Sequence, residues 1–82
     1  MISKTNLIKK ILKKYAFKKS LIDRATVNSN MVKDLNINSA RIVDIILDVE
    51  DEFEIEINSK DLEKIKTIKD LEDIIKDLIS LK

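Results

Sequence analysis

Residues 34–45 read DLNINSARIVDI, a segment that places Ser39 directly before an amphipathic pattern. After the serine, apolar residues recur with the three- and four-residue spacing of one helix face, until the pattern fades in FEIEIN, residues 53–58. The repeating positions are Ile42, Ile45, Ile46, Val49 and Phe53. We therefore expect a helix over about residues 39–54, with Ser39 in its first turn.

Further helices are expected on both sides of this segment. The first covers about residues 3–19, with Ser3 as N-cap and an apolar stripe opposed by lysines. A short helix over about 59–65 follows Asn58 or Ser59 as cap. The last, over about 68–81, begins at Thr67 and Asp70, a pair with capping-box spacing.

The rest of the chain is expected to be irregular. Residues 20–38 lack a sustained period and predict a long loop, held to the core by Leu21, Ile22, Val27, Val32 and Leu35. The five residues FEIEI have no partner strand, so they do not predict a sheet. The prediction is one all-α domain over residues 1–82, a small four-helix bundle with a long first loop and a short third helix.

Composition excludes most catalytic chemistry. The 82 residues contain no histidine and no cysteine, so disulfides, thiolate metal sites, cysteine nucleophiles and histidine bases are absent. No apolar run is long enough to span a bilayer, and the start MISKTNLIKK lacks the apolar core of a secretory signal. We therefore expect a cytoplasmic protein.

The small net charge of +1 conceals a strong asymmetry along the chain. Residues 1–33 carry nine Lys or Arg and one acid, Asp23, whereas residues 34–82 carry seven Lys or Arg and fourteen acids. Two surfaces of opposite sign are expected, each able to steer a different partner.

The helix over 39–54 carries a second apolar strip, separate from its core stripe. Ala40, Val43 and Leu47 form this strip, and acidic side chains border it. An apolar strip with an acidic border is typical of a partner-docking surface, although it could also pack against another helix of the bundle. The candidate docking residues are Ala40, Arg41, Val43, Asp44, Leu47, Glu50 and Asp51.

Ser39 itself allows two interpretations. It could serve only as an N-cap, as serine commonly does. Nucleophilic catalysis is disfavoured because no histidine is available to activate the hydroxyl. A serine at a helix N-terminus is instead well placed to carry a covalently attached phosphate, whose charge the helix dipole favours.

Residues 31–75, MVKDLNINSARIVDIILDVEDEFEIEINSKDLEKIKTIKDLEDII, resemble the acyl carrier proteins, the four-helix carriers of fatty-acid, polyketide and related biosynthesis. The family pattern of Asp-Leu-Gly, then Asp-Ser-Leu, then Glu-Glu-Phe becomes DLN, NSA and DEF here. The resemblance implies that Ser39 receives 4′-phosphopantetheine from coenzyme A through a phosphopantetheinyl transferase. The arm would then hold acyl groups as thioesters and present them to synthase enzymes, so the resemblance implies a carrier that is not itself an enzyme.

Three departures from the family pattern bear on this inference. Asn36 replaces the usual glycine, and asparagine tolerates the positive φ that such a turn needs. Asn38 replaces an acidic residue before the serine, and Ala40 replaces a leucine. A general transferase could therefore recognise this serine less well than the usual family site.

Two other functions remain open on the sequence. The chain could be an unmodified carrier-like adaptor that only binds proteins. Less favoured is a nucleic-acid or membrane-surface module that uses the lysines of the first helix: Lys9, Lys10, Lys13, Lys14, Lys18 and Lys19. The preferred interpretation is a monomeric carrier with no nucleic-acid partner and no stable membrane insertion.

Overall fold

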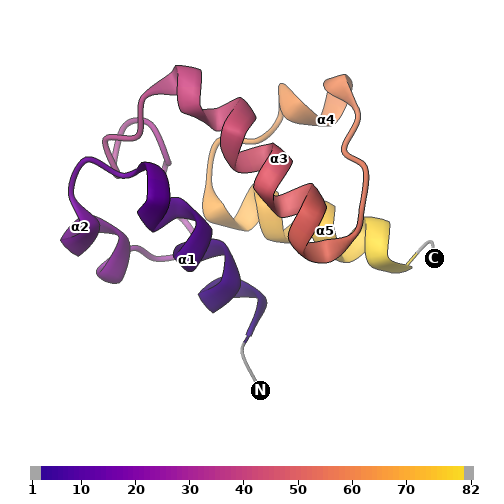
Figure 1. Cartoon of the computed structure of the whole chain (residues 1–82), viewed down its shortest axis with the longest axis horizontal. Coiled ribbons are helices and arrows are strands. Elements are labelled where there is room, and N and C mark those ends of the chain that lie inside the picture. The colour runs from indigo at the N-terminus through magenta and orange to yellow at the C-terminus, as the bar shows by residue number, and fades with distance from the viewer. Residues whose placement is uncertain (1–2, 81–82) are drawn as a thin grey trace.

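The computed structural model describes residues 3–80, which fold into five α-helices and one 3-10 turn (Figure 1). The elements are α1 (Lys4–Tyr15), α2 (Lys19–Asp23), η1 (Ser39–Arg41), α3 (Ile42–Phe53), α4 (Ser59–Leu62) and α5 (Ile68–Ser80). Over residues 3–80 the only β-type pairing is an isolated bridge between Asn30 and Thr67, and FEIEI forms no strand. The all-α prediction is confirmed.

The first helix is shorter than expected because its apolar stripe ends at Tyr15. The next inward positions at helical spacing are 18 and 19, both lysines, so a longer helix would bury two charges. The chain instead leaves the helix at Ala16 in an extended conformation (φ −77°, ψ 137°). It then forms the additional helix α2, which the sequence did not predict and which returns Ile22 to the core.

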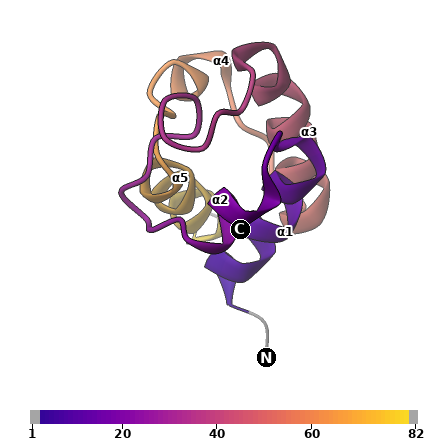
Figure 2. The ribbon, with the colours of Figure 1, turned by 90° about the vertical axis from the view of Figure 1, so that its left-hand side faces the viewer.

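Helices α1, α3 and α5 enclose the core, and α1 contacts both of the others as well as α2 (Figures 1 and 2). Each of the three contributes fully buried aliphatic side chains, among them Ile8, Ile45 and Ile75. Because all buried side chains of the described residues are apolar, the core contains no ionisable group. Within residues 3–80, no helix combines the length and the apolar character needed to cross a membrane.

The connection from α2 to η1 is irregular but well anchored. Met31, Leu35 and Ile37 are buried in it, whereas Val32, one of the expected anchors, is 41% exposed. The backbone N–H of Met31 donates to the carbonyl of Lys66 at 3.0 Å, which ties the connection to the start of α5. Asn36 adopts φ 54°, as its place in the family turn predicts.

Three helices begin at capping residues that the sequence predicted. The Ser3 hydroxyl accepts from the N–H of Asn6, and the Asn58 side chain accepts from the N–H of Asp61. Thr67 and Asp70 form the expected reciprocal pair, with distances of 3.1 Å and 2.9 Å. Helix α4 ends at Leu62, three residues earlier than expected, and position 81 lies outside the described residues.

Candidate functional site

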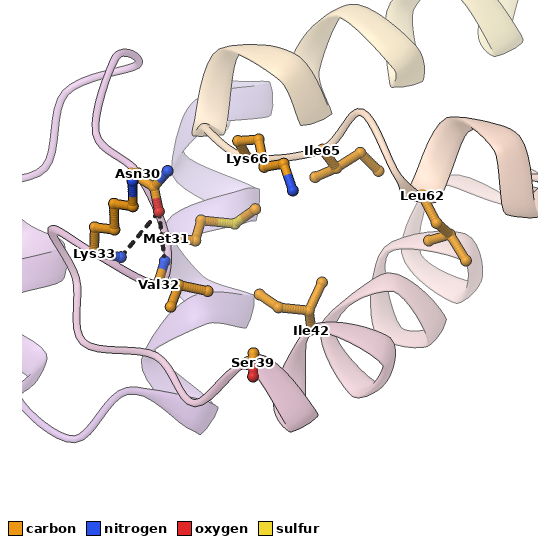
Figure 3. A pocket seen from close by; sticks show the side chains of 9 residues that line it. All are labelled: Asn30, Met31, Val32, Lys33, Ser39, Ile42, Leu62, Ile65 and Lys66. Carbon is orange, nitrogen blue, oxygen red and sulfur yellow. Dashed lines mark hydrogen bonds between the residues drawn. The ribbon is translucent and has the colours of Figure 1, made fainter.

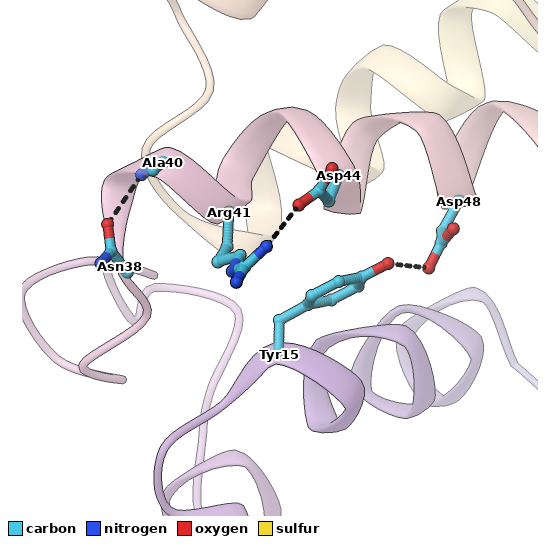
Figure 4. Close-up of polar contacts among 6 residues, drawn as sticks. All are labelled: Tyr15, Asn38, Ala40, Arg41, Asp44 and Asp48. Atoms are coloured by element: carbon cyan, nitrogen blue, oxygen red, sulfur yellow. Dashed lines mark hydrogen bonds and ion pairs between the residues drawn. The ribbon is translucent and has the colours of Figure 1, made fainter.

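Ser39 begins the 3-10 turn η1, which leads directly into α3. The N-cap of this turn is Asn38, whose side-chain oxygen accepts from the N–H of Ala40 at 2.9 Å (Figure 4). Of the two interpretations of Ser39, the N-cap is therefore wrong, because the serine backbone has already entered the turn. The Ser39 side chain is exposed and makes no hydrogen bond with the part of the chain described. Its hydroxyl is thus free for another role.

Ser39 also lines an open-sided pocket of about 370 Å³ (Figure 3). The apolar walls come from the α2–η1 connection, from the start of α3 and from the α4–α5 region: Met31, Val32, Ile42, Leu62 and Ile65. Asn30, Lys33 and Lys66 supply the remaining polar groups. In Figure 3 the Ser39 oxygen points away from the centre of the pocket.

This site suits a phosphopantetheine group on chemical grounds. An exposed hydroxyl without a competing hydrogen bond can form a phosphate ester, and the adjoining pocket offers both apolar surface and hydrogen-bond donors to a flexible arm. Among residues 3–80 there is no group of three or more His, Cys, Asp or Glu placed to hold a metal ion.

The predicted docking residues lie along one outer face of η1 and α3. Val43 and Leu47 are 58% and 54% exposed, and Ala40, Arg41 and Asp51 are also exposed. The strip therefore faces solvent and does not pack against another helix of the bundle, which was the other interpretation.

Two acidic residues of this face also have contacts within the molecule. Arg41 lies 3.2 Å from a carboxylate oxygen of Asp44 (Figure 4). One carboxylate oxygen of Glu50 accepts from the backbone N–H of Ile57 at 2.7 Å, which holds the segment after α3. The side chains of Asp44 and Glu50 are half-buried. Because Glu50 accepts the hydrogen bond from Ile57, it has a structural role besides any contact with a partner.

Sequence reasoning missed a polar contact between α1 and α3. The Tyr15 hydroxyl donates to Asp48 at 2.7 Å (Figure 4), and Lys14 lies 3.6 Å from the same carboxylate. The hydrogen bond to Asp48, together with desolvation, raises the pKa of Tyr15 above its ordinary value of 10.0. The periodicity places Tyr15 on the apolar stripe, and nothing in the sequence pairs it with an acid 33 residues away.

The lysines of α1 are partly engaged in the molecule. Lys13 forms an ion pair with Asp23 at 2.5 Å, and this hydrogen-bonded contact lowers the pKa of the Asp23 carboxyl. With Lys14 close to Asp48, two of the six lysines considered for nucleic-acid or lipid binding already have acidic neighbours.

A small helical bundle with an exposed serine hydroxyl, free of hydrogen bonds within the described residues and next to a pocket, is consistent with a carrier domain. The comparisons with known proteins give the same answer. The family described as the phosphopantetheine attachment site matches residues 6–75 of the chain.

Curated relatives add a name to this family. The acyl carrier protein of Coprothermobacter proteolyticus is 43% identical over 53 residues, a match that covers 65% of each chain. That of Buchnera aphidicola subsp. Baizongia pistaciae is 39% identical over 72 residues, 87% of this chain and 92% of the relative. That of Lactobacillus acidophilus is 44% identical over 54 residues, 66% of this chain and 68% of the relative. The chain therefore belongs to the acyl carrier protein family.

Its function is that of an acyl carrier, and its cofactor is 4′-phosphopantetheine. Carriers of this family work together with synthase and modifying enzymes. The comparisons do not favour the unmodified adaptor or the nucleic-acid and membrane-surface module.

Proposed function

We propose that Ser39 is the residue to which the arm is attached, and that the protein presents acyl thioesters on this arm without catalysing any reaction itself. The observation that carries the proposal is the exposed Ser39 hydroxyl, which makes no hydrogen bond with residues 3–80 and lies inside the matched segment. The chain has no histidine or cysteine, so the reactive thiol of the arm supplies what the side chains lack.

A phosphopantetheinyl transferase performs the attachment in this proposal. A bond forms between Ser39 Oγ and the phosphorus of coenzyme A that bears the pantetheine, and the pyrophosphate bond of coenzyme A breaks. The hydroxyl proton passes to a base on the transferase, because the chain has no histidine to accept it. The remaining nucleotide leaves with the cleaved oxygen.

The face of η1 and α3 is proposed as the surface that meets partner enzymes. It combines the exposed side chains of Val43 and Leu47 with the carboxylates of Asp44, Glu50 and Asp51, and it includes Ala40 and Arg41 beside Ser39. Such a surface suits a partner with a basic rim and an apolar centre. Mostly polar contacts favour fast, salt-sensitive association, which a shuttle needs in order to leave again.

Mass spectrometry of the intact protein tests the attachment site. The chain is incubated with coenzyme A, magnesium and a broad-specificity transferase, and Ser39→Ala is compared with Ser59→Ala. Ser59 is a matched control, because it is exposed and also follows a capping asparagine at the start of a helix. We expect the gain of one phosphopantetheine in the wild type and in Ser59→Ala, and none in Ser39→Ala. Modification of Ser39→Ala would refute the assignment.

Charge reversal tests the docking face. Asp44→Lys combined with Asp51→Lys should slow the transfer of the arm several-fold at low salt, since steering by the carboxylates is lost. Glu63→Lys with Asp73→Lys changes the net charge equally at exposed positions on other elements and serves as the control. Equal rates for the two double variants would show that net charge, and not this face, steers the partner.

We further propose the oligomeric state, location and pathway class of the protein. A monomer is expected because the exposed apolar strip is needed for partners, and light scattering should give a mass near 9.5 kDa. A cytoplasmic location and a place in fatty-acid, polyketide or related biosynthesis complete the proposal.

A further inference from the structure

Among the described residues, the pocket beside Ser39 is lined by two cationic side chains and by no carboxylate. The two ionisable residues that line it are Lys33, from the basic segment 1–33, and Lys66, from the acidic segment 34–82. Neither ammonium group forms an ion pair with any residue between 3 and 80. Figure 3 shows the Lys66 nitrogen pointing into the pocket, while Lys33 lies at the rim beside Asn30.

The acids that could neutralise these lysines are held elsewhere. A carboxylate oxygen of Asp34 accepts from the backbone N–H of Asn30 at 2.7 Å. A carboxylate oxygen of Asp70 accepts from the N–H groups of Lys66 and Thr67, both at 2.9 Å. These bonds fix the backbone on both sides of the pocket, and neither carboxylate forms an ion pair with Lys33 or Lys66.

The third polar residue also presents a donor. The side-chain oxygen of Asn30 accepts from the N–H groups of Val32 and Lys33, at 3.0 Å and 2.9 Å. Since both bonds use the oxygen, the amide NH₂ of Asn30 is the group left for a ligand. The side chains of Asn30, Lys33 and Lys66 therefore offer hydrogen-bond donors around an apolar floor.

A ligand that satisfies such a pocket has an apolar body and an anionic oxygen group at its end. The volume of about 370 Å³ is sufficient for a short acyl group, whose methylenes would contact Met31, Ile42 and Ile65. A neutral acyl chain would gain the apolar contact but would leave the donors unpaired, whereas a carboxylate would satisfy them.

We propose that the pocket formed by Asn30, Lys33 and Lys66 around an apolar floor binds the terminal carboxylate of a dicarboxylic acyl group carried on the arm. This inference rests on the proposed attachment at Ser39 and names the class of cargo that the carrier holds best. The arm folds back so that the acyl group enters the pocket, and the carboxylate lies between the Lys66 ammonium and the rim.

The test compares an adipoyl with a hexanoyl group, which have the same number of carbons and differ in the terminal carboxylate. Each is loaded from its coenzyme A thioester, and loading on Ser39 is checked by mass before the rate of thioester cleavage by hydroxylamine is measured. The same two thioesters of free pantetheine give the intrinsic reactivity. Lys66→Gln and Lys33→Gln are compared with Lys64→Gln, which removes an exposed lysine of the same region that does not line the pocket.

We expect the wild type to protect the adipoyl thioester about threefold more than the hexanoyl thioester, as a partly exposed ion pair allows. This preference should be lost in Lys66→Gln, reduced in Lys33→Gln, retained in Lys64→Gln and weakened in about 0.5 M NaCl. Equal protection of both cargoes by a correctly loaded wild type would overturn this inference and would leave the proposed attachment at Ser39 intact.

Two other outcomes also decide the question. Phosphorus NMR of the unloaded holo-protein could show a phosphodiester signal that changes in Lys66→Gln, with no adipoyl preference. The lysine would then bind the phosphate of the arm, and the cargo assignment would be wrong. A wild-type chain that takes up no arm at Ser39 would overturn the proposed function and, with it, this inference.

Discussion

Asn38 and Ser39 are adjacent in the chain but have different roles in the structure. The Asn38 side chain satisfies the N–H of Ala40, whereas the Ser39 hydroxyl contributes no hydrogen bond within the described residues. If Ser39 carries the arm as proposed, its modification does not disturb the cap. The asparagine that departs from the family pattern thus maintains the start of the helix.

The cap can be tested by two alanine variants of the unmodified protein. Asn38→Ala should lower the free energy of unfolding by about 1 kcal/mol, since it removes the cap, and Ser39→Ala should change it by less than about 0.5 kcal/mol. Urea unfolding followed by circular dichroism measures both. A larger loss for Ser39→Ala than for Asn38→Ala would mean that the serine caps the helix in solution.

Asp70 makes stability depend on pH. The N–H of Thr67 holds the pKa of this carboxyl below its ordinary value, and the N–H of Lys66 and the Thr67 hydroxyl add to the effect. Because the pKa is lower in the folded state, the stabilisation is complete above the ordinary value of 3.8 and is lost as the pH falls through the folded-state pKa.

Asp70→Asn keeps an acceptor at this position but removes its charge. At neutral pH we expect the variant to be less stable than the wild type by about 1 kcal/mol, and the gap should close as the pH falls from neutral through the folded-state pKa, which lies below 3.8. Urea unfolding across this range measures the gap. Asp73→Asn removes an exposed carboxylate from the same helix and shows the effect of charge alone. A gap that stays constant with pH would contradict the linkage.

At the scale of elements, the bond from Tyr15 to Asp48 joins the end of α1 to the middle of α3. Tyr15 is the only tyrosine in the chain, so its ultraviolet absorbance reports one group. We expect titration of the folded protein to give a pKa above 10.0, and Asp48→Asn to bring that pKa down towards this value. Glu52→Gln, an exposed acid on the same helix, should have a much smaller effect.

The same contact contributes to stability over a defined range of pH. Tyr15→Phe should lower the free energy of unfolding at neutral pH, because the hydrogen bond to Asp48 is lost. Because the tyrosine pKa is raised in the folded state, this contribution is present below pH 10.0 and is lost as the pH rises through the folded-state pKa. A tyrosine pKa at its ordinary value would show that the bond does not persist in solution.

The sequence predicted those elements whose own residues determine them. The capping pair Thr67 and Asp70 and the apolar stripe of α3 depend on spacing along one segment, and both appear as expected. The end of α1 also follows from its own residues, since the apolar stripe stops at Tyr15 before two lysines, although the prediction extended the helix to about residue 19. Helix α2 depends on where the core lies, which local periodicity does not contain. For the same reason Val32 was expected as an anchor, although Met31 beside it is the buried residue.

The candidate site divides in the same way. The position of Ser39 and the outer strip of Val43 and Leu47 follow from one helix and its projection. The pocket requires residues 30–33, 39, 42 and 62–66 to come together, and only the tertiary structure brings these segments side by side (Figure 3).

On the scale of the whole molecule, the fold depends on an aliphatic core shared by three helices. With 82 residues, total stability should be only about 4–12 kcal/mol. Each fully buried side chain is then a considerable part of the total, because a small domain has few of them. Core packing also affects the pocket beside Ser39, because Met31 and Ile65 both line this pocket and belong to the core.

Leu71 and Ile79 allow this dependence to be measured within one helix. Leu71 in α5 is fully buried, whereas Ile79 in the same helix is 39% exposed. Leu71→Ala should lower the free energy of unfolding by about 2–5 kcal/mol through the cavity it leaves, and Ile79→Ala should cost much less. Urea unfolding of the unmodified protein measures both losses. If they were similar, the core would be loosely packed, and an acyl group could enter it without the fixed pocket walls on which selectivity between cargoes depends.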